Sequence, residues 1–245
     1  MFTPEERDQL RAELVAAARA DPRIQGAALT GSAATGLQDR WSDIDLLFGL
    51  HPGSDLPSVL ADWTARMYQH GAVHHLDVPF GGTVYRVFLL QGGLQVDLGF
   101  APEGEFGARA PSFHLLFGTA GELPKVSPPP AEYLIGMAWL HAVHARACIG
   151  RGKLWQGEYM VSGLRDQVLS LACLRYGLPA LQGRGMDRLP AEVTQPLQSA
   201  LVQRLEAEEL RRALRVAVDA LLIEIQFVDE ALAARLHEVL TGLAR

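Results

Sequence analysis

Two aspartates separated by a single residue, Asp43 and Asp45, begin an apolar run that continues to Leu50. Alternate residues of a strand point to the same face, so the pattern predicts that both carboxylates project together. Their Cα atoms would lie roughly 6.5–7 Å apart, from a rise of about 3.3 Å per residue. Two carboxylates so placed suit one metal ion, or a pair of ions about 3.5–4 Å apart. The apolar residues that alternate with them would fill a core on the opposite face.

Gly31 and Ser32 precede these aspartates by ten residues and follow a second apolar run. A glycine lets a phosphate approach the backbone closely, and a serine at the start of a short helix offers a hydroxyl and an N–H donor. A Gly-Ser pair alone is typical of any turn. The Gly-Ser pair gains significance from the aspartates downstream. Asp39, in the intervening loop, is interpreted as a turn residue.

The stretch of residues 29–50 resembles the nucleotidyltransferase superfamily that includes DNA polymerase beta, whose signature is Gly-Ser followed by Asp-x-Asp. Its form here is closest to the small-molecule branch, notably the aminoglycoside adenylyltransferases. The superfamily commonly has a third acid further along the sheet, and Asp97 meets that expectation. In residues 94–100, alternation places Gln95, Asp97 and Gly99 on one face and four apolar residues on the other.

The resemblance implies a magnesium-dependent transfer of a nucleoside monophosphate. Three clustered carboxylates repel one another, and a hard, oxygen-seeking cation relieves that repulsion. We expect one Mg²⁺ to hold the triphosphate through Asp43 and Asp45, and a second, shared with Asp97, to activate the attacking hydroxyl. Gly31 and Ser32 would seat the phosphates of the nucleotide, ATP being the first choice. Pyrophosphate would leave.

Further candidates open a long helix in the second half of the chain. Lys153 could reach the triphosphate as a point charge, or be a solvated lysine in a turn. Trp155, Glu158 and Tyr159 offer aromatic surface and a carboxylate suited to an amino sugar, although helix packing accounts for the two aromatic residues equally well. The general base remains open between Asp97 and Glu158.

Composition narrows the class of protein. The 245 residues include 49% hydrophobic and 20% charged side chains, as in ordinary globular proteins. The formal net charge of −6 and the lack of a basic stripe argue against an extended nucleic-acid partner. The sequence shows neither a secretory signal nor an apolar run of about 18 residues, so we expect no membrane partner. Cys148 and Cys173 are interpreted as reduced core residues of a cytoplasmic protein.

Periodicity indicates the elements that must position these residues. We expect helices over residues 4–20, with a capping box from Thr3 to Glu6, and 57–69. Strands are expected over residues 24–30, 44–50, 73–79, 83–90 and 94–100. A stretch rich in glycine and proline follows, over residues 101–130. Beyond it the pattern is helical, over residues 131–149, 154–177, 193–204 and 206–241.

The expected fold class is therefore α/β. A nucleotidyltransferase-type mixed sheet with flanking helices would form a catalytic domain over residues 1–127. An α-helical substrate-binding domain would follow over residues 128–245, with the site between the two.

Three interpretations of function remain. The leading one is an enzyme that nucleotidylates a hydroxyl of a small molecule. An aminoglycoside-type antibiotic is the first candidate for that molecule and would make the protein a resistance enzyme. The second is transfer onto a protein or RNA, as in minimal nucleotidyltransferases paired with toxins. The third is a non-catalytic nucleotide-binding module. The acceptor, the nucleotide preference and the oligomeric state are not determined by the sequence.

Overall fold

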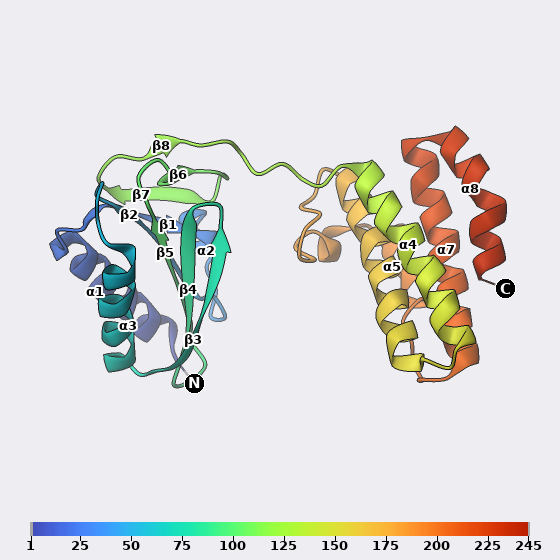
Figure 1. Ribbon diagram of the computed structural model, residues 1–245, viewed down its shortest axis with the longest axis horizontal. Coiled ribbons are helices and arrows are strands. Elements are labelled where there is room, and N and C mark those ends of the chain that lie inside the picture. Colours follow the sequence, from blue (N-terminus) through green and yellow to red (C-terminus); the bar gives the residue numbers. More distant parts are fainter. Residues whose placement is uncertain (1, 245) are drawn as a thin grey trace. The chain divides into compact units, whose positions relative to one another are not determined.

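The protein, as a computed structural model, is described over residues 2–244. It divides into two compact units, Met1–Val126 and Ser127–Arg245, coloured blue to green and yellow-green to red in Figure 1. The expected fold class is confirmed: a mixed six-stranded sheet with flanking helices makes up the first unit, and the second is helical. Among the helices described, none combines the length and apolar character needed to cross a membrane.

The first unit alternates helices and strands before it closes with short strands. Its elements are α1 (Pro4–Ala20), β1 (Ile24–Thr30), α2 (Gly31–Ala34), β2 (Ile44–Leu50), α3 (Leu56–Gln69), β3 (Ala72–Phe80), β4 (Thr83–Leu90), β5 (Gln95–Ala101), β6 (Gly107–Ala108), β7 (Phe113–Phe117) and β8 (Gly121–Glu122). The capping box expected at α1 is confirmed, because the Thr3 hydroxyl accepts from the Glu6 N–H and the Glu6 carboxylate accepts from the Thr3 N–H.

The main sheet has the strand order β3-β4-β5-β2-β1-β7. Strands β2 and β5 are parallel, and every other neighbouring pair is antiparallel. The parallel pair places Asp45 directly opposite Asp97. The two strands on which the sequence predicts carboxylates are therefore adjacent at the centre of the sheet.

The two faces of this sheet are covered differently. One face packs against α1 and α3, where Phe48 lies 4.7 Å from Trp63 and 5.7 Å from Phe100 between ring centroids. The other face is covered at one end by Phe106, which lies over the backbone of Gly26 and Gly49. A Cβ at either glycine would come within 2.6 Å of the Phe106 ring, so close packing requires glycine there.

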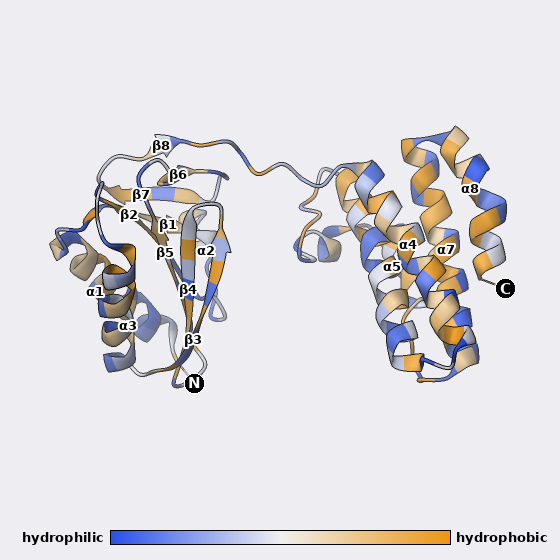
Figure 2. Cartoon of the chain, viewed as in Figure 1, coloured by the Kyte–Doolittle hydropathy of each residue, from blue (hydrophilic) through white to orange (hydrophobic). Residues whose placement is uncertain are grey.

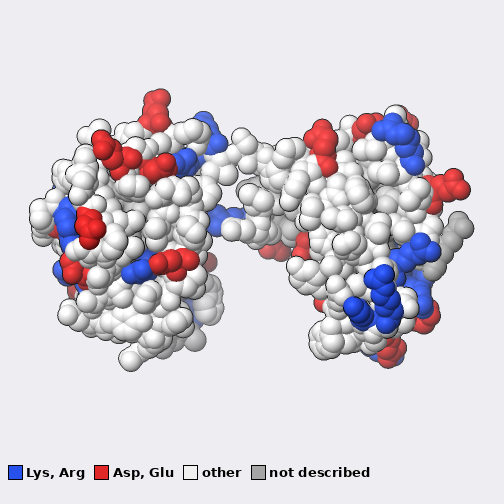
Figure 3. Space-filling view, in the orientation of Figure 1, with Lys and Arg blue, Asp and Glu red and all other residues white. Residues whose placement is uncertain are grey.

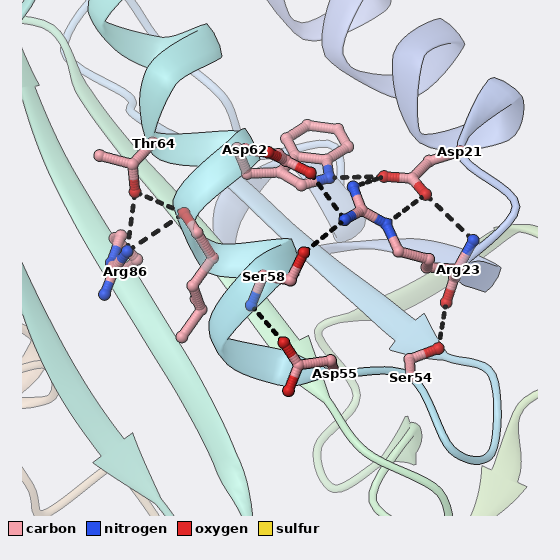
Figure 4. Close-up of polar contacts among 10 residues, drawn as sticks. Asp21, Arg23, Ser54, Asp55, Ser58, Asp62, Thr64 and Arg86 are labelled. Carbon is pink, nitrogen blue, oxygen red and sulfur yellow. Dashed lines mark hydrogen bonds and ion pairs between the residues drawn. The ribbon is translucent and has the colours of Figure 1, made fainter.

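A polar network ties the start of β1 to α3 (Figure 4). The Arg23 guanidinium donates to both oxygens of Asp21, at 2.9 and 2.8 Å, and to Asp62 at 2.7 Å. The indole N–H of Trp63 donates to the same Asp21 carboxylate at 3.1 Å. The buried side chain of Trp63 thus anchors the chain at the turn that leads into β1.

The glycine- and proline-rich stretch over residues 101–130, for which the sequence predicts no strand, contains short strands in the structure. It contains β6, β7 and β8, and β7 completes the edge of the main sheet beside β1. The five-residue strand β7 shows no clear alternation of burial, because an edge strand is open to solvent on several sides. Its pairing with β1 determines its conformation, and a period-2 pattern does not reveal it.

The second unit consists of helices whose apolar faces meet in one core. They are α4 (Ala131–Gly150), α5 (Leu154–Arg175), α6 (Ala191–Gln198), α7 (Ala207–Val228) and α8 (Glu230–Leu243), with a short 3₁₀ turn, η1 (Met186–Arg188). Figure 2 shows hydrophobic and hydrophilic stretches sharing each of these longer helices, as amphipathic packing requires. Cys148 and Cys173 are buried, free thiols.

Two helix predictions in this unit are wrong in extent. The helix expected over 206–241 is divided at Asp229, which has an extended backbone and whose carboxylate accepts from the Leu232 N–H to cap α8. The helix expected over 193–204 ends at Gln198. Arg212 donates to backbone carbonyls just beyond that end, including that of Leu201 at 3.0 Å, which stabilises a non-helical course.

Candidate active site

Three carboxylates converge on the sheet face that does not pack against α1 and α3. Asp43 lies just before β2, Asp45 in β2 and Asp97 in β5, and all three are partly buried. One oxygen from each lies within 4.8 Å of the others. This grouping fits a metal site, because carboxylate oxygens are the ligands that hard divalent cations prefer.

The local sequence explains why β2 presents its aspartates to this face. Ile44, Leu46 and Phe48 are completely buried on the opposite face, against the helices. A shift of one residue would bury a carboxylate among apolar side chains and expose these three residues. The period of the strand therefore determines the direction in which Asp45 points.

Gly31 lies directly against the carboxylate of Asp45. Its φ of +60° is in the left-handed region, and a Cβ at this position would overlap the Asp45 carboxylate. Both the backbone conformation and the lack of space thus require glycine. The Gly-Ser pair and the Asp-x-Asp pair, which the sequence separates by ten residues, are in contact here.

Gly31 and Ser32 open α2, which is only four residues long. Ser32 is partly buried, and its carbonyl accepts from the Thr35 hydroxyl at 3.1 Å and from the Leu37 N–H at 3.1 Å. These contacts fold the chain back after the glycine. Ser32 is therefore the residue next to Gly31, which contacts the Asp45 carboxylate of the cluster.

The loop before Asp43 is held by a residue that sequence reasoning missed. Arg7 of α1 is only 4% exposed, and its Nη1 donates to the carbonyls of Asp39, at 2.5 Å, and Ser42, at 3.3 Å. The Asp39 carboxylate accepts from the Trp41 N–H at 2.8 Å, a contact that lowers the pKa of Asp39, and from the Ser42 hydroxyl at 3.1 Å. The signal in the sequence is the position of Arg7, which falls at helical spacing with Leu10 and Leu14 on the apolar face of α1.

The electrostatics of the site reflect crowded negative charge. Burial raises the pKa of Asp97, and the neighbouring Asp43 adds to the rise, whereas a hydrogen bond from the Gln95 amide, at 2.9 Å, opposes it. Burial also raises the pKa of Tyr85, to which Asp45 contributes and which Arg109 opposes. The site therefore favours a compensating positive charge.

Tyr85 is the second residue that sequence reasoning missed. It lies in β4 opposite Gly99, and its ring rests against the glycine backbone: a Cβ at Gly99 would come within 2.8 Å of the ring. Its position beside the carboxylates follows from the pairing of β4 with β5. No local pattern around residue 85 indicates it.

The candidates from the second half of the chain lie together at the start of α5. Lys153 is exposed and is the residue before the helix. Trp155 and Tyr159 are 78% and 67% exposed, so they do not serve the packing of this unit. Glu158 is partly buried and accepts from the Ser162 hydroxyl at 2.6 Å. The spacing of i, i+3 and i+4 puts the three residues on one side of the helix.

Comparisons with known proteins add little to this description. No protein-family model matches the sequence, and no curated protein does. Among solved structures, the chain is similar to an aminoglycoside 6-adenyltransferase from Bacillus subtilis. That similarity covers 99% of each chain, at 13% identity and a TM-score of 0.43.

Proposed function

We propose that this protein is a nucleotidyltransferase that moves a nucleoside monophosphate, AMP from ATP in the first instance, onto a hydroxyl of a small molecule. The observation that carries the proposal is the contact between Gly31 and Asp45 inside a cluster of three carboxylates. In the reaction, the acceptor oxygen bonds to the α-phosphorus, the bond to the β-phosphate oxygen breaks and pyrophosphate leaves. The hydroxyl proton passes to a carboxylate or to water.

The donor set fits Mg²⁺. Magnesium binds oxygen ligands at about 2.0–2.1 Å, so two oxygens of one coordination shell lie up to about 4 Å apart. The spread of at most 4.8 Å among Asp43, Asp45 and Asp97 is close to that limit and also suits two ions. Once bound, the cations would neutralise phosphate charge and lower the pKa of the acceptor hydroxyl.

The residues of the chain would divide the remaining work. Asp43 and Asp45 would hold the cation that accompanies the triphosphate, and Asp97 would complete the site on the side of the acceptor. The N–H groups and hydroxyl at Gly31 and Ser32 would contact the terminal phosphates. Asp97 is also a candidate general base, because its raised pKa favours proton uptake, and Glu158 is the other candidate.

Residues at the start of α5 would recognise the acceptor and the phosphates. Lys153 supplies a positive charge, and Trp155, Glu158 and Tyr159 combine exposed aromatic surface with a carboxylate. Such a surface suits a cationic sugar. This chemistry and the sequence resemblance make an aminoglycoside the first acceptor to test, and Glu158→Gln should raise the KM of cationic acceptors. Asp166→Asn, on the same helix, is the matched control.

Pyrophosphate release tests the proposal. The wild-type protein, Mg²⁺ and each nucleoside triphosphate are incubated with a panel of aminoglycosides and other hydroxylated antibiotics. We expect release that depends on the acceptor and falls at least about 100-fold in Asp43→Asn/Asp45→Asn. Release that persists in this variant would disprove the role of the carboxylates. Magnesium-dependent nucleotide binding without release would point to a protein or RNA acceptor or to a non-catalytic role.

A further inference from the structure

A pocket of about 190 Å³ lies in the first unit beside the carboxylate cluster, and we name it the Tyr85 pocket. Thr30, which precedes Gly31, and Leu47, which follows Asp45 by two residues on the same face, both line it. Residues two apart in a strand are separated by about 6.5–7 Å. The pocket therefore lies about one pair of strand residues away from the proposed reaction centre.

Tyr85 and Leu47 both contact the site of Gly99, and the pair Asp45 and Asp97 comes two residues earlier in the two strands β2 and β5. Asp45 and Arg109 act in opposite directions on the pKa of Tyr85, which the carboxylate raises and the guanidinium lowers. Tyr85 itself lines the pocket. A ring bound in the pocket therefore lies about one pair of strand residues, roughly 6.5–7 Å, from the carboxylates.

The lining combines apolar rings with hydroxyl groups. Phe80 and Phe113 supply aromatic surface, and Thr83, Tyr85 and Ser112 supply hydroxyls. Thr83 is only 3% exposed. Aromatic faces pack against the C–H groups of a saturated ring, and hydroxyls pair with the polar groups at its rim, so this lining suits a hydroxylated ring.

The charges that line the pocket cancel. Arg109 and Glu105 both line it and form an ion pair with each other, and the Arg109 guanidinium lies 5.9 Å from the centroid of the Phe80 ring. A charged group that entered would lose water without gaining a free counter-charge. The lining itself therefore offers a cationic or anionic ring no free counter-charge.

Size limits the occupant further. Pockets for drug-sized ligands measure about 300–1,000 Å³, so this one accommodates a fragment of an acceptor and excludes a whole polycyclic molecule. One ring with its substituents is the appropriate size.

We propose that the Tyr85 pocket binds a single uncharged, hydroxylated ring of the acceptor and presents one of its hydroxyls to the carboxylate cluster. This inference rests on the proposed function. It restricts the substrate class: whatever charge the acceptor has elsewhere, the ring that is modified bears no ammonium or carboxylate group.

Ring binding can be measured without turnover, by saturation-transfer NMR on the full-length protein. The probes are glucose, galactose and myo-inositol as neutral rings, glucosamine and glucuronate as charged counterparts, and adenine as a nucleobase. Ser112→Leu fills the pocket, and Ser112→Ala is its matched control. Ala110→Leu, at an exposed position of the lining, is a second filling variant in case the first does not fold.

We expect at least one neutral ring to bind wild type and Ser112→Ala, at least about tenfold more tightly than its charged counterparts, and to lose binding in the filled variants. Absence of neutral-ring binding, binding unaffected by filling, or a preference for a charged ring or adenine would overturn the inference. Magnesium-dependent binding of a non-hydrolysable ATP analogue is measured in parallel. If wild type binds the ring but not the ATP analogue, the result contradicts the proposed nucleotidyl transfer and leaves the ring-binding role of the pocket supported.

Discussion

Gly31 shows how one residue can serve both the backbone and the chemistry of a site. Its positive φ would be strained with any side chain, and the Asp45 carboxylate occupies the space that a Cβ would need. Gly36, five residues later, has a φ of +70° but open space around it. A side chain would strain the backbone at both glycines, but only at Gly31 would it also collide with the Asp45 carboxylate.

We predict that Gly31→Ala reduces nucleotidyl transfer at least about 100-fold, because Asp45 is displaced from the cluster. Gly36→Ala should leave activity near wild type, although both variants lose about 1–2 kcal/mol of stability from the left-handed backbone. Steady-state kinetics and thermal unfolding separate the two effects. Equal loss of activity in both variants would show that the contact with Asp45 is unimportant.

The charged carboxylate of Asp97 should lower the stability of the folded protein when no metal is bound. Because burial raises its pKa, the native state favours the protonated form, and stability is lost as pH rises through the native pKa. With metal chelated, Asp97→Asn should therefore be more stable than wild type at neutral pH. The difference should vanish below the ordinary pKa of an aspartate, about 3.9. Chemical denaturation across this pH range measures it.

Asp77 in β3 is the matched control for this prediction. Arg86 pairs with it, at 2.7 Å, and lowers its pKa, so Asp77→Asn should not stabilise the protein at neutral pH. The Asp97 variant should also lose binding of Mn²⁺, which the Asp77 variant retains. A destabilised Asp97→Asn in chelator would refute the electrostatic account.

Among the elements, the junction of α1, β1 and α3 is held by the paired carboxylate of Asp21. The hydrogen bonds from Arg23 lower the pKa of Asp21 to about 2. Since the depressed pKa belongs to the folded state, the stability it contributes is present above about 3.9 and is lost as pH falls towards 2. This junction determines how β1, and with it Gly31, enters the sheet.

We predict that Asp21→Asn lowers the free energy of unfolding at neutral pH by about 1.5–3 kcal/mol, the range for hydrogen bonds to charged groups. The deficit should shrink between about pH 4 and pH 2. Asp62→Asn, which removes the exposed partner of the same arginine, should cost less than about 1 kcal/mol. Denaturant titrations at several pH values test both. A deficit independent of pH would assign the effect to packing.

At the scale of the whole molecule, charge is divided unevenly. Residues 1–126 contain 15 acidic and 9 basic side chains, whereas residues 127–245 contain 13 of each. The net charge of −6 thus belongs to the first unit. On the face visible in Figure 3, acidic and basic side chains are interspersed on this unit, and the acidic ones do not form a single patch there. A negative unit attracts cations and cationic acceptors over long range.

The hydrophobic cores are divided in the same way. Each core cluster among the described residues draws its members from one unit alone. We therefore predict that residues 1–126 fold when expressed alone and bind Mn²⁺ as the full chain does, with transfer activity lost. Circular dichroism and a Mn²⁺ titration test this, with Asp45→Asn in the same fragment as the control. An unfolded fragment would show that the second unit is required for the fold.

Local features of the fold were predictable from the sequence because they depend on neighbouring residues. The capping box at Thr3 and the alternation over β2 follow from backbone periods and side-chain contacts within a few residues. Asp97 was predicted from its strand pattern and a family resemblance.

What only the tertiary structure decided are contacts between segments far apart in the chain. Three such contacts shape the site. Asp45 lies opposite Asp97 in the sheet register, and the Tyr85 ring contacts Gly99. Arg7 donates hydrogen bonds to the loop before Asp43. Local periodicity determines which face a side chain occupies but leaves open which strand lies beside it. Which strands are neighbours depends on the packing of the complete sheet. The carboxylate cluster and the pocket beside it both result from that strand order.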